Sequence, residues 1–174
     1  MDADEIREWS NRYNDGYPQE HQTIEENLHE RLTEQQYITQ DQLAKVINWK
    51  LDNQPGRRDR FTEDMRSVPD EFVRLVSEAA LLIDDPNQQL HTLDSIPGVG
   101  GAMATVVLAF YDPTNYAVGD RYIVDVLFGD DRQMRFSDYP KILAELGQRN
   151  PGDFDLRTVE KAYYQRYREE NDII

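Results

Sequence analysis

Apolar residues recur along the chain at intervals of three and four positions, the spacing of one face of an α-helix. The first such segment contains Ile6, Trp9 and Tyr13. No long alternation of apolar and polar residues, which is typical of strands, separates the segments. The pattern therefore predicts an all-α fold of about eight helices, with later apolar faces at Leu28 and Leu32; Leu43, Val46, Ile47 and Leu51; Phe72, Leu75, Val76, Ala79 and Ile83; Met103, Val106, Val107 and Phe110; Ile123, Val126 and Leu127; Ile142, Leu143 and Leu146; and Leu156, Val159, Tyr163 and Tyr167.

Polar residues ahead of three of these segments indicate where the helices begin. Thr23 and Thr39 are each followed three positions later by Glu or Gln, the spacing of a capping box. Ser67 is expected to cap the next helix, with Pro69 in its first turn. The longest stretch between helical segments, residues 52–66, is polar and is expected to be a connection.

The stretch SIPGVGGAMATVV, residues 95–107, predicts a tight turn between two helices. Pro97 ends the first helix, and Ala104 allows the second helix to approach it closely. Gly98 and Gly100 permit positive φ and leave the backbone uncovered. The N–H groups of residues 99–102 would then be free at a helix N-terminus, which is a site for an anion. The alternative is a helix corner with no ligand.

Composition limits the class of protein. The chain has 174 residues, of which 39% are hydrophobic, and this is enough for one domain with a core. No apolar run is long enough to span a bilayer, and the N-terminus lacks the shape of a signal peptide. The absence of cysteine excludes disulfides and iron–sulfur clusters. We therefore expect a soluble, cytoplasmic protein without a membrane partner.

The charge is strongly negative, with a formal net charge of −15. The chain is rich in Asp and has only four lysines against fifteen arginines, a composition that favours a halophilic type of surface, with an ordinary acidic protein as the alternative. Such acidity opposes non-specific binding to nucleic acid in dilute buffer. In molar salt, however, the Debye length is about 3 Å, and local contacts then decide what binds.

Two stretches resemble the helix-hairpin-helix DNA glycosylase superfamily, and in particular its endonuclease III type. LDSIPGVGGAMATVVLAF, which begins at Leu93, is similar to the hairpin of that family. NYAVGDRYIVDVL, which begins at Asn115, places Asp120 where the family keeps an aspartate. The resemblance extends over residues 90–128. The Trp-Lys helix in VINWKLDN and the step from Tyr116 to Asp120 are also similar to a loosely defined group of small hairpin proteins.

The resemblance implies a bundle of two helical subdomains that binds DNA and excises a damaged base. The hairpin, formed by Gly98, Val99, Gly100, Gly101 and Ala102, would hold a phosphate. The carbonyl groups of Ile96 and Val99 would hold K⁺ or Na⁺, with no other cofactor. A base would be flipped into a pocket between the subdomains, and Asp120 would activate water or stabilise the cationic sugar.

The departures from the family pattern also carry implications. Ala102 replaces the lysine with which bifunctional members attack the sugar, and no other lysine lies nearby in the sequence. The resemblance therefore implies a monofunctional N-glycosylase without lyase activity. Gly119 replaces an apolar residue, and Asp125 replaces a basic one. No two of the three histidines have the spacing of metal ligands, so we expect no transition-metal site.

Further candidates come from the residues themselves. Arg57 and Arg58, with Arg60, form the basic cluster that would contact phosphates, although they could equally pair with surface carboxylates. Tyr37 and Trp49 are candidates for a base pocket, with the protein core as the alternative. Asp120 is also well placed to cap the helix that follows it, and this role is compatible with catalysis.

We expect a single domain over residues 1–174. Its central helical subdomain is expected at 68–148 with the hairpin at 90–110, and flanking helices are expected in 1–67 and 149–174. The hypothesis that follows is a DNA-binding protein of glycosylase fold acting in base excision repair. The alternative is a non-catalytic module of the same fold that binds nucleic acid or another protein.

Overall fold

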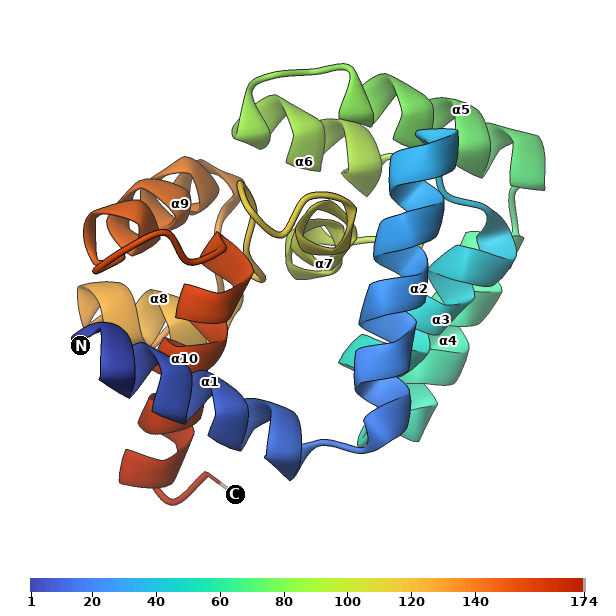
Figure 1. Cartoon of the computed structure of the whole chain (residues 1–174). Coiled ribbons are helices and arrows are strands. Elements are labelled where there is room, and N and C mark those ends of the chain that lie inside the picture. Colours follow the sequence, from blue (N-terminus) through green and yellow to red (C-terminus); the bar gives the residue numbers. More distant parts are fainter. Residues whose placement is uncertain (174) are drawn as a thin grey trace.

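The regular secondary structure of residues 1–173, the part of the chain that this computed structural model describes, is entirely helical (Figure 1). No helix in this range combines the length and apolar composition needed to cross a bilayer. Within the described residues, ten α-helices and one 3₁₀-helix follow one another: α1 (Ala3–Gly16), α2 (Gln19–Gln35), α3 (Gln40–Lys50), α4 (Pro55–Arg66), α5 (Asp70–Leu81), α6 (Pro86–Asp94), α7 (Gly101–Tyr111), α8 (Arg121–Phe128), η1 (Phe136–Asp138), α9 (Tyr139–Gln148) and α10 (Leu156–Glu170).

Helix α7 is the centre of the larger of two apolar clusters. Every residue from Met103 to Phe110 is buried, as expected for a helix that is hydrophobic on all sides. Helices α2, α3 and α6 pack around α7, which Figure 1 shows end-on between them and α9. This first cluster also includes buried residues of α4 and α5.

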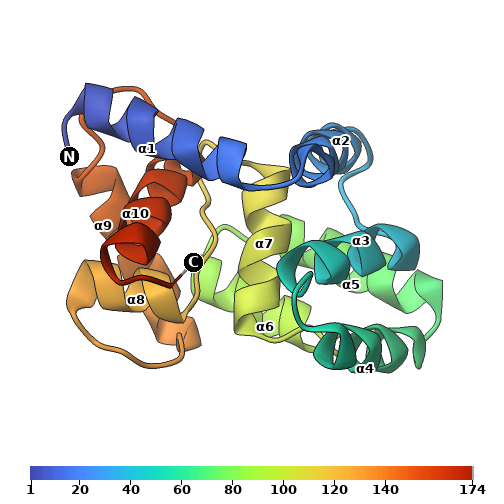
Figure 2. The same cartoon turned by 90° about the horizontal axis from the view of Figure 1, so that it is seen from below.

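The second cluster joins the two ends of the chain. Helix α1 lies along α10, and α8 and α9 complete the group (Figure 2). Ile6, Ile123, Ile142 and Val159 are fully buried there. Helix α1 thus packs with the C-terminal helices, whereas α2 and α3 pack with α7.

The predicted helical hairpin is present in α6, the turn that follows it, and α7. Leu93, Ile96 and Ala104 are buried where the two helices meet. Gly98 has a φ of +81°, and a Cβ atom at this position would lie 2.4 Å from the Phe61 carbonyl oxygen. Only glycine fits this close approach between the turn and α4.

The expected number of eight helices was too low, chiefly because α4 occupies the stretch 52–66 that was expected to be a connection. Met65 is its only buried residue, so the segment lacks the apolar periodicity by which helices are recognised. Pro55 at its first position and the polar side chains that follow are nevertheless compatible with an exposed helix. Packing of Met65 and Phe61 into the first cluster holds it in place.

Local details confirm some predictions and correct others. Thr39 caps α3 in a capping box, as predicted. Thr23 instead lies inside α2, where its hydroxyl donates to the Gln19 carbonyl, and Ser67 ends α4. The apolar face predicted for α5 was also wrong, because Phe72 and Leu75 are exposed. The buried face of α5 consists of Val73, Ser77 and Ala80, which are offset by one position from that prediction.

Replacing Gly98 with Ala should lower the free energy of unfolding by more than about 1 kcal/mol, because Ala tolerates neither the positive φ nor the contact with Phe61. Urea unfolding followed by circular dichroism measures this change. Gly100→Ser is the matched control, since a Cβ there meets no atom within 4 Å and the backbone is already extended. A loss for Gly98→Ala no larger than that for Gly100→Ser would contradict this explanation.

Candidate functional site

Asp120 caps helix α8, as the sequence predicted. One carboxylate oxygen, Oδ1, accepts hydrogen bonds from the backbone N–H groups of Tyr122 and Ile123 at 2.9 and 3.1 Å. The capping role fixes the orientation of the side chain and leaves the second oxygen, Oδ2, available for another partner.

The extended segment that ends at Asp120 forms hydrogen bonds with side chains of three helices. The Gly119 N–H donates to the Thr105 hydroxyl of α7 at 2.9 Å, and the Tyr139 hydroxyl of α9 donates to the Ala117 carbonyl at 2.8 Å. The Val118 N–H points to Glu160 of α10 at 3.4 Å. These contacts place Asp120 at the boundary between the two clusters, in a position set by both.

At Gly119, where the resemblance predicts an apolar side chain, Met134 occupies the adjacent space. A Cβ atom at this position would lie 2.5 Å from the sulfur of Met134. The space that an apolar side chain would occupy before the aspartate is therefore filled by Met134 from the loop that precedes η1.

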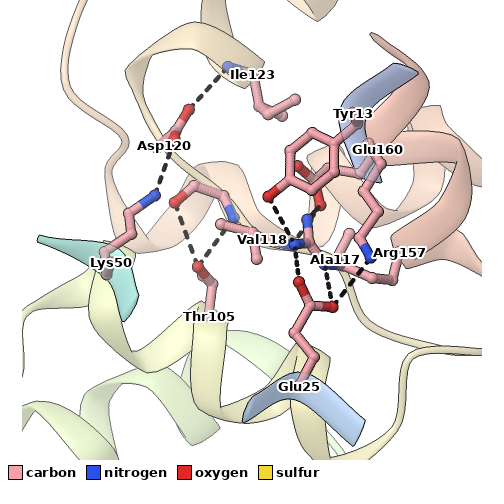
Figure 3. A network of polar contacts seen from close by, with 12 residues as sticks. Tyr13, Glu25, Lys50, Thr105, Ala117, Val118, Asp120, Ile123, Arg157 and Glu160 are labelled. Atoms are coloured by element: carbon pink, nitrogen blue, oxygen red, sulfur yellow. Dashed lines mark hydrogen bonds and ion pairs between the residues drawn. The ribbon is translucent and has the colours of Figure 1, made fainter. Parts of the chain in front are cut away.

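Lys50, the last residue of α3, supplies the partner of the second carboxylate oxygen. Its Nζ lies 2.9 Å from Asp120 Oδ2, and the two side chains are only 20% and 14% exposed. Figure 3 shows Lys50 reaching Asp120 from one side while the N–H of Ile123 meets it from the other. The sequence-based expectation that no lysine lies nearby considered only the hairpin, and the fold corrects it by bringing α3 to this point.

Asp120 and Lys50 line two adjoining cavities. One, of about 700 Å³, opens along the hairpin, and the other, of about 540 Å³, lies between α1, α3 and α10. Three further residues line both cavities: Gln54, Tyr122 and Tyr164. The carboxylate–amine pair therefore stands where the two cavities meet.

The hairpin lines the first cavity with its backbone. Gly98, Val99, Gly100, Gly101 and Ala102 all contribute to its wall. The N–H groups of Gly101 and Ala102, in the first turn of α7, have no hydrogen-bond acceptor in the described part of the chain. The N–H of Val99 is not free, contrary to expectation, because it donates to the Ile96 carbonyl within the turn at 3.1 Å.

The predicted basic cluster is divided by the fold. Arg57 lines the same cavity as the hairpin, where it donates to the Gln54 side chain at 2.7 Å and lies 5.4 Å from the centre of the Phe61 ring. Arg58 is not among the lining residues and is paired with Asp59. The structure thus brings Arg57, but not Arg58, together with the hairpin.

Aromatic side chains form much of the second cavity. Trp49 lines it and is 8% exposed, with an indole N–H that has no hydrogen-bond partner. Tyr37 lines neither cavity and lies beside Arg74 instead. The sequence did not suggest a cavity role for the other aromatic residues of this wall. They come from α1, the residue that ends it, α2, α8 and α10, and are Tyr13, Tyr17, His21, Tyr122 and Tyr164.

A buried network of charged side chains lies at the inner end of the second cavity. Arg157, which is 3% exposed, contacts Glu160, donates to Glu25 at 2.8 Å and donates to the Tyr13 hydroxyl at 3.1 Å (Figure 3). Lys161 pairs with the same Glu25 at 3.1 Å. Two cations and two carboxylates therefore balance one another, and they tie α10 to α2 and, through Tyr13, to α1.

Burial and pairing act in opposite directions on the two carboxylates. Burial raises the pKa of Glu160, and the neighbouring Arg157 only partly offsets this effect. For Glu25, burial also favours a higher pKa, but Arg157 and Lys161 together outweigh it and the pKa is lowered. Glu25 is thus the carboxylate whose charge stabilises the network.

Comparison with protein families, characterised proteins and solved structures gave no match to this chain. Its function is therefore inferred from its own residues and geometry.

Replacing Glu25 with Gln should destabilise the protein by about 3–5 kcal/mol at neutral pH, because it leaves two buried cations with one carboxylate. The folded-state pKa of Glu25 lies below its ordinary value of 4.5, so its stabilising effect is present above that pH and is lost as the pH falls through the folded value. The difference between the wild type and the variant should therefore narrow in acid.

Urea unfolding at a series of pH values tests both expectations. Glu26→Gln is the control, because this neighbouring side chain is exposed. A difference between the wild type and Glu25→Gln that grows as the pH falls would contradict the assignment.

Proposed function

We propose that this protein binds DNA along the two adjoining cavities, with a phosphate at the hairpin and an unstacked base in the aromatic cavity. The observation that carries the proposal is the position of Asp120, which lines both cavities and so lies between the two groups of the ligand. A nucleotide joins a phosphate and a base through a sugar, and in this placement the sugar lies beside the carboxylate.

Gly100 supports a ligand at the hairpin. Its φ is −88° and a Cβ atom would meet nothing within 4 Å, so neither backbone conformation nor packing requires glycine there. This contrasts with Gly98, which the fold itself requires. A bare backbone beside free N–H groups at a helix N-terminus is suited to close approach by a phosphate. A monovalent cation at the Ile96 and Val99 carbonyls belongs to the same proposal.

The charges around the cavities favour an anionic ligand more than the whole chain does. Cations and anions are equal in number among the lining residues, whereas the complete chain has a net charge of −15. The cations are Lys50, Arg57, Arg121, Arg157 and Arg168, and the anions are Asp52, Asp64, Asp94, Asp120 and Glu160. At high ionic strength the distant carboxylates are screened, and these local charges decide whether DNA binds.

The chemistry that we propose is hydrolysis of the bond between a damaged base and its sugar. As this bond breaks, positive charge develops on the sugar, and a carboxylate in a partly dry cleft stabilises it. Trp49, Tyr122 and Tyr164 offer surfaces on which the base can stack. Asp120 is the residue assigned to this step.

A non-catalytic binding module is the second candidate, and one observation favours it. Both oxygens of Asp120 are engaged, Oδ1 by two backbone N–H groups and Oδ2 by Lys50. In this state the negative charge of Asp120 is compensated by Lys50, and the carboxylate is not free to activate water. Catalysis by Asp120 therefore requires that Lys50 move or take part.

Gly100→Glu should weaken binding to a DNA duplex at least about tenfold, because it places a carboxylate where the phosphate would lie. Fluorescence anisotropy in concentrated potassium chloride measures the affinity. Gly100→Ser adds a Cβ that fits the protein without contact and brings no charge, so it should weaken binding much less than Gly100→Glu does. Equal affinities for the Glu and Ser variants, or no binding by any protein, would overturn the hairpin assignment.

Duplexes that each carry one damaged base test excision directly. Cleavage of the strand after alkali treatment should appear with at least one of them and should be lost in Asp120→Asn. Asn caps helices as well as Asp does, so this change removes the charge while the helix start is preserved. Binding without cleavage across the whole panel would favour the non-catalytic module.

A further inference from the structure

The outer face of α5 carries a row of exposed apolar side chains. Phe72, Leu75 and Leu82 are 37%, 58% and 81% exposed, and the exposed Ala79 lies between them. Within residues 1–173 the only other large apolar side chain that is classed with them as exposed is Phe128, at the end of α8. Three of the four such side chains thus share one face of one helix, and contiguous apolar patches of this kind mark interaction surfaces.

The spacing of this α5 row is that of a seam between two paired helices. Positions 72, 75, 79 and 82 are separated by three, four and three residues, so the row follows one narrow stripe of the helix. The half-buried side chains of Val76 and Ile83 widen the stripe on one side. Helices that lie along one another in coiled coils meet through stripes of this spacing. The α5 row therefore fits a second helix lying along α5.

Polar contacts on the inner side of α5 hold it in the rotation that turns the row outward. The buried Ser77 hydroxyl accepts a hydrogen bond from the Ile38 N–H at 2.9 Å, and Asp70 accepts one from the Gln40 N–H at 2.8 Å. The inward face consequently buries a serine and an alanine beside Val73, while phenylalanine and leucine side chains face outward. Packing within the chain does not account for large apolar side chains on the outer face, whereas a partner does.

Two carboxylates border the α5 row on one side. Glu71 and Glu78 are exposed, lie seven residues apart and form no ion pair within the described part of the chain. The nearby Arg74 is already paired with Asp70. The last turn of α5 contains no basic residue and Asp84 follows it, so the negative end of the helix dipole has the same sign. This border complements a helix whose own apolar seam is flanked by Lys or Arg.

A second copy of this chain fits the α5 row poorly. A two-fold dimer pairs a surface with itself, so it would bring Glu71 and Glu78 toward the same carboxylates of the other copy. Like charges that meet across an interface oppose binding. The net charge of −15 on each copy adds repulsion at longer range.

We propose that the α5 row is a docking site for a basic amphipathic helix of another protein. The row supplies the apolar contact, and Glu71 and Glu78 select a partner with basic residues one heptad apart. Helix α5 packs against α6 and α3 and lies at the edge of the molecule (Figure 1). No residue of α5 lines either cavity, so this partner and DNA can be bound at the same time.

Titration with a synthetic helical peptide tests the docking site. The peptide spans about three heptads, with Leu at the two seam positions of each heptad and Lys at the flanking positions, where like charges oppose pairing of the peptide with itself. Fluorescence anisotropy of the labelled peptide should show saturable binding to the wild type. Leu75→Gln combined with Leu82→Gln should weaken binding at least about tenfold, because two side chains that are buried on binding are lost.

Two controls separate the α5 row from general effects. Phe128→Gln removes a side chain that is 42% exposed on a different helix, so this variant should bind the peptide as the wild type does. A scrambled peptide of the same composition has no seam and should bind at least about tenfold more weakly, although its attraction to an acidic protein is the same. Phe72→Gln provides a second change within the row, and circular dichroism shows whether each variant is folded.

The acidic border is tested by a separate pair of variants. Glu71→Gln combined with Glu78→Gln should weaken peptide binding several-fold in dilute potassium chloride. This loss should disappear in molar potassium chloride, where the Debye length is about 3 Å. Glu8→Gln combined with Asp15→Asn removes the same charge from exposed positions of α1 and should change binding much less.

Three results would overturn the proposal. They are the absence of saturable peptide binding, equal binding of the seam and scrambled peptides, and equal binding by the wild type and the folded variant that lacks Leu75 and Leu82. Sedimentation equilibrium should show a monomer, and self-association that the same variant abolishes would assign the α5 row to a second copy instead. DNA affinity should be the same in this variant and the wild type, so the docking site and the proposed function fail separately.

Discussion

The ion pair between Lys50 and Asp120 joins the two halves of this molecule at the point where its cavities meet. Lys50 ends α3 in the cluster built around α7, and Asp120 begins α8 in the cluster that contains both ends of the chain. Because each side chain is less than a quarter exposed, water and salt screen the pair less than they would at the surface. The position of each cluster relative to the other therefore determines the geometry of the site.

The same constraint links folding and chemistry. Asp120 uses one oxygen to begin a helix and the other to hold an amine, and the segment before it is fastened by Thr105, Tyr139 and Glu160. A carboxylate restrained in this way keeps its orientation, which favours catalysis. Its charge, however, is already compensated by Lys50. Any reaction of Asp120 at this site therefore also involves Lys50.

The sequence predicts those parts of the fold that depend on local signals. The hairpin, the cap at Asp120 and the capping box at Thr39 follow from short patterns whose physical basis lies within a few residues. Helix α4 did not follow from any such pattern, because its stability comes from burying Met65 against other helices rather than from its own periodicity. The face of α5 was displaced for the same reason, since several apolar residues compete and tertiary packing selects among them.

The sequence does not predict which side chains that lie far apart along the chain come into contact. Seventy residues separate Lys50 from Asp120, and no spacing rule connects them. The sequence suggested no cavity role for Tyr122 or Tyr164, yet both line the two cavities. One signal was available: Lys50 is one of only four lysines among nineteen basic residues, and it directly follows the tryptophan considered for the base pocket.

Nuclear magnetic resonance titration with a DNA duplex tests most directly whether the hairpin and the carboxylate form one site. The backbone N–H groups of Gly101 and Ala102 report on the hairpin, and those of Tyr122 and Ile123 report on Asp120. The account predicts that both sets shift together and saturate at the same DNA concentration. Shifts confined to other surfaces, or a response of one set without the other, would contradict it.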